Sequence, residues 1–259
     1  MQRLGWTVSD RPDDAFRATV RRSVDLLAAF RQEQTRPDVF YSALARDSAA
    51  QVASYLPLEG ARLLDVGGGP GYFAEAFEAR GALYVPLDAD AGELALHGRA
   101  PGPRTVLGDG TSLPFRDAGF DVVYSSNVAE HVRHPWRMAD EMVRVVRPGG
   151  LVFLSYTLWY GPWGGHETAP WHYLGGDRAA RRYTRRHGRP PKNVYGQSLF
   201  RTTAAAGLRW ARARQLDGTL AEVHAVPRYL PRWAYGLARV PVLREVICWN
   251  LAVVGRRSG

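Results

Sequence analysis

The sequence predicts an α/β protein built on a parallel β-sheet, and two observations support this prediction. From Ala61 onward, short apolar runs alternate with helix-like segments, at residues 61–66, 82–87, 104–107, 120–125 and 150–155. Such runs are typical of strands that are buried on both faces of a parallel sheet. The first run ends at four glycines within Gly67–Gly71, and a helix-like segment, Tyr72–Arg80, follows them directly. This order is that of a βαβ unit.

Length and composition favour one domain over residues 1–259, with an ordinary apolar content of 46%. No apolar run reaches the roughly 18 residues that a membrane span needs. The single Cys248 excludes an internal disulfide and a cysteine-based zinc cluster. Met1–Asp14 lacks the apolar region of a signal peptide. We therefore expect a cytoplasmic protein.

Residues 1–60 are predicted to be helical. Apolar residues between Phe16 and Phe30 recur at steps of three and four, which is typical of one helix face. Pro37 breaks this pattern, and a second helix is predicted to end before Pro57. The strands and turns of residues 61–155 then form the expected core.

The chain changes character after Ser155. Residues 156–176 are rich in Trp, Tyr, Gly and Pro, which predicts an aromatic-rich cap within the segment 156–246. A helix is expected near residues 195–206, a weak strand at 208–215 and a closing strand at 247–255. The mixture of arginines and aromatics in residues 228–239 favours packing over the sheet edge, although such a mixture also occurs at membrane interfaces.

The net charge is +9, and the positive charge is unevenly distributed along the chain. Seven basic residues lie in the segment from Arg178 to Lys192. The simplest interpretation is a solvated helix face. An acidic acceptor or an anionic membrane surface, and hence a peripheral membrane contact, is the alternative. No nucleic-acid partner is expected, since no recognised binding motif accompanies these residues.

The glycine turn brings backbone N–H groups close to a ligand, because no Cβ blocks the approach. Gly69–Ala74 also matches the dinucleotide pattern G-x-G-x-x-A. However, Pro70 removes one N–H group, and Asp65 would meet a diphosphate with negative charge. A carboxylate at this position suits a cationic amine or a ribose. The turn therefore favours S-adenosylmethionine as the ligand.

Two further carboxylates follow predicted strands. Asp88 ends the second strand, where a carboxylate can accept both hydroxyls of an adenosine ribose, and Asp90 is the alternative if the register shifts by two residues. Asp109, in the turn Gly108–Phe115 after the third strand, is placed to accept a hydrogen bond from an adenine amino group.

Together with Phe120–Val132 and Val146–Leu154, these motifs make Leu63–Ser155 resemble the class I S-adenosylmethionine-dependent methyltransferases. The nearest likeness is to the small-molecule branch that includes ubiquinone and menaquinone biosynthesis enzymes. The resemblance implies a Rossmann-like, doubly wound sheet of seven strands, the last antiparallel. It also implies one set of cofactor-binding residues: Asp65, Gly67 and Gly69 at the methionine part, Asp88 at the ribose, Asp109 and Gly110 at the adenine, and Asn127 at the boundary with the substrate. Pro86 and Leu87 depart from the family's usual glycine and valine.

The methyl acceptor is expected beyond the carboxyl ends of the fourth and fifth strands. His131 and His166 are candidate bases there, with structural roles as the alternative. Four side chains are candidates for the acceptor pocket: Tyr41, Trp159, Trp163 and His172. No metal is expected, since His166, Glu167 and His172 lack a spacing that puts them on one face.

The sequence thus predicts methyl transfer from S-adenosylmethionine to a small-molecule acceptor, acidic or lipid-like. O-methylation is favoured because histidines flank the predicted acceptor site. Two alternatives remain open: a nicotinamide-dependent oxidoreductase, and a non-catalytic protein that binds the cofactor on the same fold.

Overall fold

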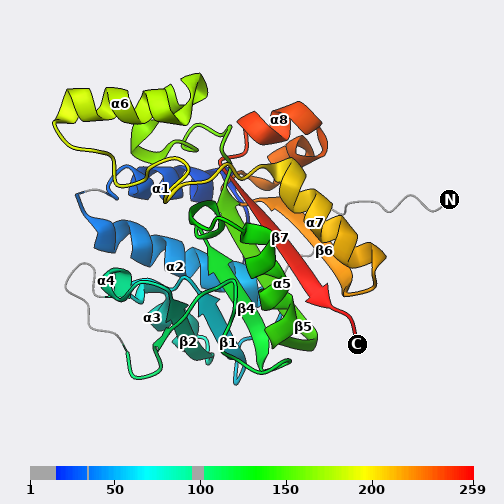
Figure 1. Ribbon diagram of the computed structural model, residues 1–259. Helices are drawn as coiled ribbons and strands as arrows, with labels where there is room; N and C mark the ends of the chain where they lie inside the picture. The colour runs from blue at the N-terminus through cyan, green and yellow to red at the C-terminus, as the bar shows by residue number, and fades with distance from the viewer. Residues whose placement is uncertain (1–15, 34, 95–101) are drawn as a thin grey trace.

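Seven strands form one mixed sheet in the order β3-β2-β1-β4-β5-β7-β6, with β7 antiparallel to both of its neighbours (Figure 1). The computed structural model describes residues 16–33, 35–94 and 102–259, so the predictions for Met1–Asp14 lie outside the described residues. The strands are β1 Arg62–Val66, β2 Leu83–Asp88, β3 Val106–Leu107, β4 Phe120–Ser126, β5 Val146–Thr157, β6 Leu220–Pro227 and β7 Asn250–Arg257. The predicted Rossmann-like sheet with an antiparallel last strand is confirmed.

Helices cover both faces of this sheet. On one face, Val52 of α2 and Phe77 of α3 pack with Leu63 of β1. On the other, Met138 of α5 and Leu208 of α7 belong to a second core cluster. The helices are α1 Val20–Phe30, α2 Pro37–Ala53, α3 Tyr72–Glu78, α4 Ala91–Leu94, α5 Pro135–Val145, α6 Gly176–His187, α7 Ala204–Leu216 and α8 Pro241–Val246. None of the helices in the described ranges is long and apolar enough to cross a bilayer.

The two N-terminal helices form where the apolar pattern predicts them. Thr19 caps α1, because its side chain accepts a hydrogen bond from the Arg22 N–H. Pro37 occupies the first turn of α2. Backbone N–H groups in the first turn have no acceptor within the helix, so the absence of an N–H on proline removes no hydrogen bond. Pro37, which was predicted to break the helical pattern, is therefore also the first residue of the second helix.

Two predictions for the C-terminal third are wrong. Residues 208–215 are not a strand but lie inside α7, which begins at Ala204 instead of near residue 195. Their apolar residues also fit one helix face, and Thr203 caps the helix by accepting from the Ala206 N–H. The sixth strand is β6, which the sequence did not predict. Glu222 and His224 interrupt its apolar residues, so no continuous apolar run marks it.

The closing strand begins later than predicted. Residues 247–249 precede β7, because Pro241 starts α8 and Ile247 forms the C-cap of that helix. Four short 3-10 segments complete the described elements and lie in connections: η2 Ala129–His131, η3 His166–Thr168, η4 Trp171–Leu174 and η5 Arg232–Arg239.

A fully buried arginine, Arg228, fixes the end of the sheet from which the site is built. It directly follows β6, and its guanidinium donates to the hydroxyls of Ser126 at the end of β4 and of Ser155 in β5. It also donates to Ser48 of α2 and to Tyr124 of β4. One side chain thus ties three strands and a helix together.

We expect Arg228→Met to lower the free energy of unfolding by about 2–4 kcal/mol, because it removes these charged hydrogen bonds and leaves buried hydroxyls without their donor. Urea denaturation followed by circular dichroism measures the change. Arg212→Met, at an exposed position of α7, is the matched control. Equal stability of the two variants would contradict this role of Arg228.

Candidate functional site

The glycine turn after β1 has three left-handed glycines, with φ of 84° at Gly67, 48° at Gly69 and 75° at Gly71. A Cβ on Gly67 would lie 2.3 Å from the Val128 side chain, so this glycine is needed for packing. A Cβ on Gly69 or Gly71 would meet nothing within 4 Å among the described residues. The turn therefore leaves bare backbone facing open space, as a bound ligand requires.

Asp65 lies beneath this turn and is 2% exposed. Its carboxylate accepts a hydrogen bond from the Tyr84 hydroxyl at 2.6 Å. Burial raises the pKa of Asp65 to about 7, although the Tyr84 hydrogen bond opposes that effect. The sequence did not single out Tyr84, because nothing local marks which residue of β2 faces Asp65.

Asp88 reaches back to the glycine turn. One of its carboxylate oxygens accepts from the Gly69 N–H at 3.1 Å, and the other accepts from the Asp90 N–H. Asp90 instead accepts from the Gly92 N–H, within its own turn. Of the two predicted alternatives, Asp88 is therefore the one in contact with the glycine turn.

The unusual Pro86 and Leu87 do not prevent close contact between β2 and this turn. The Leu87 carbonyl accepts from both the Gly67 and Gly68 N–H groups, at 2.7 and 3.1 Å. A Cβ on Gly68 would lie 2.9 Å from the Pro86 Cβ, so a side chain at position 68 would collide with Pro86. Pro86 and Leu87 therefore leave the backbone contact between β2 and the glycine turn in place.

Asp109 and Gly110 follow β3, which pairs in parallel with β2 at the same edge of the sheet. The Asp109 carboxylate accepts from the Thr111 N–H at 2.7 Å and from its hydroxyl. A Cβ on Gly110 would lie 3.0 Å from the Val66 side chain. The turn is thus held rigidly beside the end of β1.

Asn127, directly after β4, has φ of 57°, which is uncommon for a residue with a side chain. Its amide group accepts from the Asn250 side chain at 2.7 Å and donates to the Tyr229 hydroxyl at 3.3 Å. The sequence did not identify Asn250 or Tyr229, because both contacts span more than 100 residues.

The structure brings His131 and His166 together from η2 and η3. Their Nε2 atoms are 3.2 Å apart, and the His131 Nδ1 lies 2.7 Å from the Ser198 carbonyl oxygen. A carbonyl only accepts, so Nδ1 holds the proton of a neutral His131 and Nε2 keeps its lone pair. Burial lowers the pKa of His166, and the neighbouring His131 lowers it further.

Glu130 adds a carboxylate to this pair. One carboxylate oxygen and one ring nitrogen of each histidine lie within 4.8 Å of one another. The side chain is 1% exposed, and its Oε1 accepts from the Thr157 N–H at 3.0 Å. Its Oε2 accepts no hydrogen bond from any residue that the structure describes. Nothing in the sequence marks Glu130 beyond its position beside His131.

Glu167 and His172, considered from the sequence as metal ligands together with His166, do not join the group of Glu130, His131 and His166. Glu167 accepts from the Lys192 N–H and from the Asn193 side chain. His172 is buried against Trp159 and Tyr173, and burial lowers its pKa. His166 is thus grouped with Glu130 and His131 instead.

The four candidate acceptor residues do not line one pocket. Tyr41 and Trp163 contact aromatic residues of the N-terminal helices and their surroundings, whereas Trp159 and His172 lie inside the cap. Tyr41 stacks on Tyr72, with ring centroids 5.1 Å apart, and so lies over the first residue after the glycine turn. Trp163 packs between Phe30 of α1 and Trp249. Trp159 and His172 pack on each other inside the cap, so part of their role is structural.

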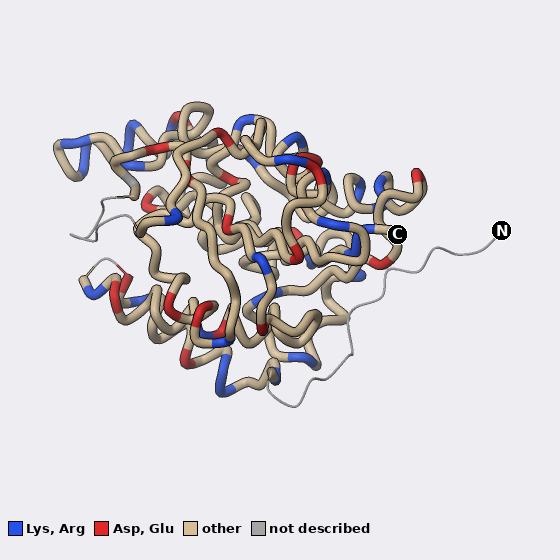
Figure 2. The backbone as a smooth tube through the Cα atoms, turned by 90° about the horizontal axis from the view of Figure 1, so that it is seen from below, with Lys and Arg blue, Asp and Glu red and all other residues tan. Residues whose placement is uncertain are grey.

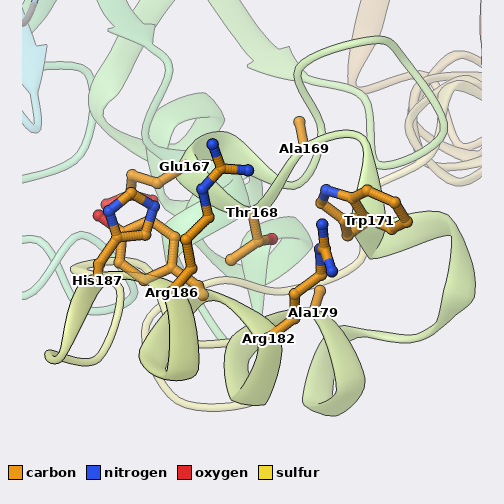
Figure 3. A pocket seen from close by; sticks show the side chains of 9 residues that line it. Glu167, Thr168, Ala169, Trp171, Ala179, Arg182, Arg186 and His187 are labelled. Carbon is orange, nitrogen blue, oxygen red and sulfur yellow. The ribbon is translucent and has the colours of Figure 1, made fainter.

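Two cavities open in the cap. One has a volume of about 170 Å³, and Figure 3 shows Glu167, Arg182 and Arg186 around it. The Arg182 guanidinium lies 3.8 Å from the centre of the Trp171 ring. The other has a volume of about 460 Å³, and its lining includes Trp159, Tyr160, His172, Arg178, Arg181, Tyr195 and Arg201.

The basic segment predicted as a helix face is α6, and its arginines are exposed. Figure 1 shows α6 and α8 at the end of the sheet where β5 ends. Elsewhere, positive residues occur on several sides of the molecule (Figure 2). The described part of the chain therefore has positive charge both at the cap and far from it.

Comparison with known proteins matches the strand-rich core to a family model and most of the chain to whole relatives. Residues 64–154 match a family model described as a methyltransferase domain. An uncharacterized methyltransferase of Mycolicibacterium gilvum is 54% identical over 93% of this chain and 96% of its own length. One of Mycobacterium tuberculosis is 52% identical, with the same coverage. A solved SAM-dependent methyltransferase of Archaeoglobus fulgidus, 12% identical, shares the fold with a TM-score of 0.54 over 88% of this chain and 98% of its own.

The glycine turn offers a matched pair of variants. We expect Gly69→Ala to cost about 1 kcal/mol of stability, from its left-handed backbone alone. Gly67→Ala adds a clash with Val128 and should cost about 2–4 kcal/mol. Urea denaturation of both variants measures the difference, and a smaller loss for Gly67→Ala would contradict the packing role of that glycine.

Proposed function

The chain belongs to the class I S-adenosylmethionine-dependent methyltransferases, and we propose that it methylates an oxygen atom of a small-molecule acceptor. Methyl transfer with S-adenosylmethionine as the cofactor follows from the family. The nature of the acceptor, the atom methylated and the residues of the site are the proposed part. The likeness to ubiquinone and menaquinone enzymes and the cytoplasmic location stay predictions.

The charges around the glycine turn support the assignment of the cofactor residues. Asp65 is a buried carboxylate, which an incoming ammonium group would stabilise in its ionised form. A diphosphate would instead add negative charge beside Asp65 and Asp88. The Gly69 N–H already donates to Asp88, so it is not free to bind phosphate. These contacts favour the methionine part of the cofactor over a nicotinamide dinucleotide.

In our proposal, Gly67 and Gly69 border the methionine part, while Asp88 holds the ribose hydroxyls. Asp109 and Gly110 border the adenine, and Asn127 separates cofactor from acceptor. The support is that these residues lie at or just after the carboxyl ends of β1, β2, β3 and β4, where ligands of open α/β sheets bind.

The contact between His131 and His166 is the observation on which O-methylation depends. Transfer from a sulfonium is an in-line displacement, so the protein mainly aligns the acceptor and excludes water. A hydroxyl acceptor must also lose its proton. The lone pair that the Ser198 contact leaves on the His131 Nε2 can receive it, and His166 lies within reach to share it.

An acidic acceptor is favoured by the larger cavity of the cap. Arg178, Arg181 and Arg201 line it, and guanidinium groups bind carboxylates and phosphates in a bidentate manner. Tyr160 and Tyr195 add flat apolar surface beside them. A lipid-like acceptor is the second candidate, because Trp233 of η5 and Val242 of α8 are 78% and 73% exposed.

Asp88→Ala should weaken binding of S-adenosylhomocysteine by about 1–3 kcal/mol, roughly 5- to 150-fold, because a charged hydrogen-bond partner is lost. Isothermal titration calorimetry measures the affinity, with NADH as the competing ligand. Asp90→Ala is the matched control in the same turn. Unchanged affinity, or tight binding of NADH, would contradict the assignment.

His166→Ala and His131→Ala should each lower methyl transfer by about 100-fold or more, the range for losing a general base, with little change in cofactor affinity. Transfer of a radiolabelled methyl group into a cell extract, followed by mass spectrometry of the product, supplies the assay. His134→Ala, at an exposed position nearby, is the control. Full activity of both variants would restrict the histidine pair to a structural role.

A further inference from the structure

We propose that Glu130, His131 and His166 bind one divalent transition-metal ion of the Zn²⁺ class. The three side chains come from η2 and the start of η3, and their nearest ligand atoms lie within 4.8 Å of one another. None of the three is exposed. Two imidazoles and a carboxylate are a typical donor set for such ions, and here the carboxylate is buried and the imidazoles are partly buried.

The spacing of the two imidazoles fits a shared ion. Zinc–nitrogen bonds are about 2.0–2.1 Å long, so two nitrogens on a tetrahedral ion lie roughly 3.3–3.4 Å apart. The Nε2 atoms of His131 and His166 are 3.2 Å apart. Ligand atoms on one tetrahedral ion lie roughly 3.4 Å apart, so from a separation of up to 4.8 Å the Glu130 carboxylate needs a shift of up to about 1.4 Å to complete a bond of about 2.0–2.2 Å.

Neighbouring groups already orient these ligands. The Ser198 carbonyl lies 2.7 Å from the His131 Nδ1, which directs the lone pair of Nε2 toward His166. Metal-bound histidines usually donate their other ring N–H in this way. The Thr157 N–H holds the Oε1 atom of Glu130 and leaves Oε2 for another partner.

A hydrogen bond between the two histidines would explain their contact but not the third side chain. The Oε2 atom of Glu130 is buried and has no hydrogen-bond donor among the described residues. A buried carboxylate oxygen without a partner is costly, and a cation would offset this cost. His166 also has φ of 48°, so the backbone is strained where it directs this ring.

The donor set also indicates which ion binds. Two imidazole nitrogens suit Zn²⁺, Co²⁺ or Ni²⁺, whereas Mg²⁺ and Ca²⁺ prefer oxygen ligands alone. Three protein ligands leave one tetrahedral position for an external oxygen. This consequence rests on the proposed function: an acceptor hydroxyl bound there would lose its proton more readily. The metal-bound state and direct proton uptake by the histidines exclude each other, since both use the Nε2 lone pairs.

Titration of the EDTA-treated full-length protein with Co²⁺ tests the site, because tetrahedral Co²⁺ has a characteristic visible spectrum. We expect one equivalent to bind, and Zn²⁺ to displace it. His166→Ala and Glu130→Gln should weaken binding by about tenfold or more. Gln at position 130 keeps an acceptor for the Thr157 N–H, and the melting temperature and S-adenosylhomocysteine affinity verify that each variant is folded. His134→Ala is the matched control.

Binding weaker than about 1 mM, or binding that both folded variants retain in full, would overturn the proposal. Methyl transfer is measured separately, with and without added Zn²⁺. Transfer by a protein that binds no metal overturns the metal site and leaves the proposed function standing. One bound equivalent that depends on His166 and Glu130 supports the metal site, even if no acceptor in any extract becomes labelled.

Discussion

The buried guanidinium of Arg228 sets the geometry on which the candidate site depends. A charge enclosed by protein needs hydrogen-bond partners, and here three serines and one tyrosine of β4, β5 and α2 accept from its two terminal nitrogens. The ends of β4 and β5 are thereby held at fixed positions relative to the segment after β6. Asn127 and the cap follow directly from these ends, so their placement depends on the same contacts.

Several candidate site residues lie where the chain turns sharply with a left-handed backbone, after β1, after β4 and within the cap. Gly67 and Gly69 turn the chain after β1 with left-handed backbones that cost glycine little. Asn127 and His166 have left-handed backbones with side chains present, which costs more. Hydrogen bonds from Asn250 and to Tyr229 hold the first, and the contact with His131 holds the second.

The parallel part of the fold could be predicted, and candidate cofactor residues could be named, because their signals in the sequence are local. A buried strand, a glycine turn and a terminal carboxylate each occupy fewer than ten consecutive residues. The C-terminal third was harder: Glu222 and His224 interrupt β6, and the apolar residues of 208–215 fit a helix as well as a strand. Arg228 could not be distinguished from the other arginines, since its partners lie 73 to 180 residues away.

The acceptor side was predicted only in part, because it is formed by docking of the cap onto η2. Both histidines were candidates, but nothing in the sequence shows that their rings meet. Ser198 accepts from His131, and the Phe200 N–H donates to the Glu130 carbonyl at 2.7 Å. The same cap segment therefore holds two of the three proposed metal ligands, while His166 comes from its beginning. The histidine pair exists only when the cap is seated on η2. In the proposed function, acceptor binding in the cap and proton or metal chemistry at the pair would therefore be coupled through one interface.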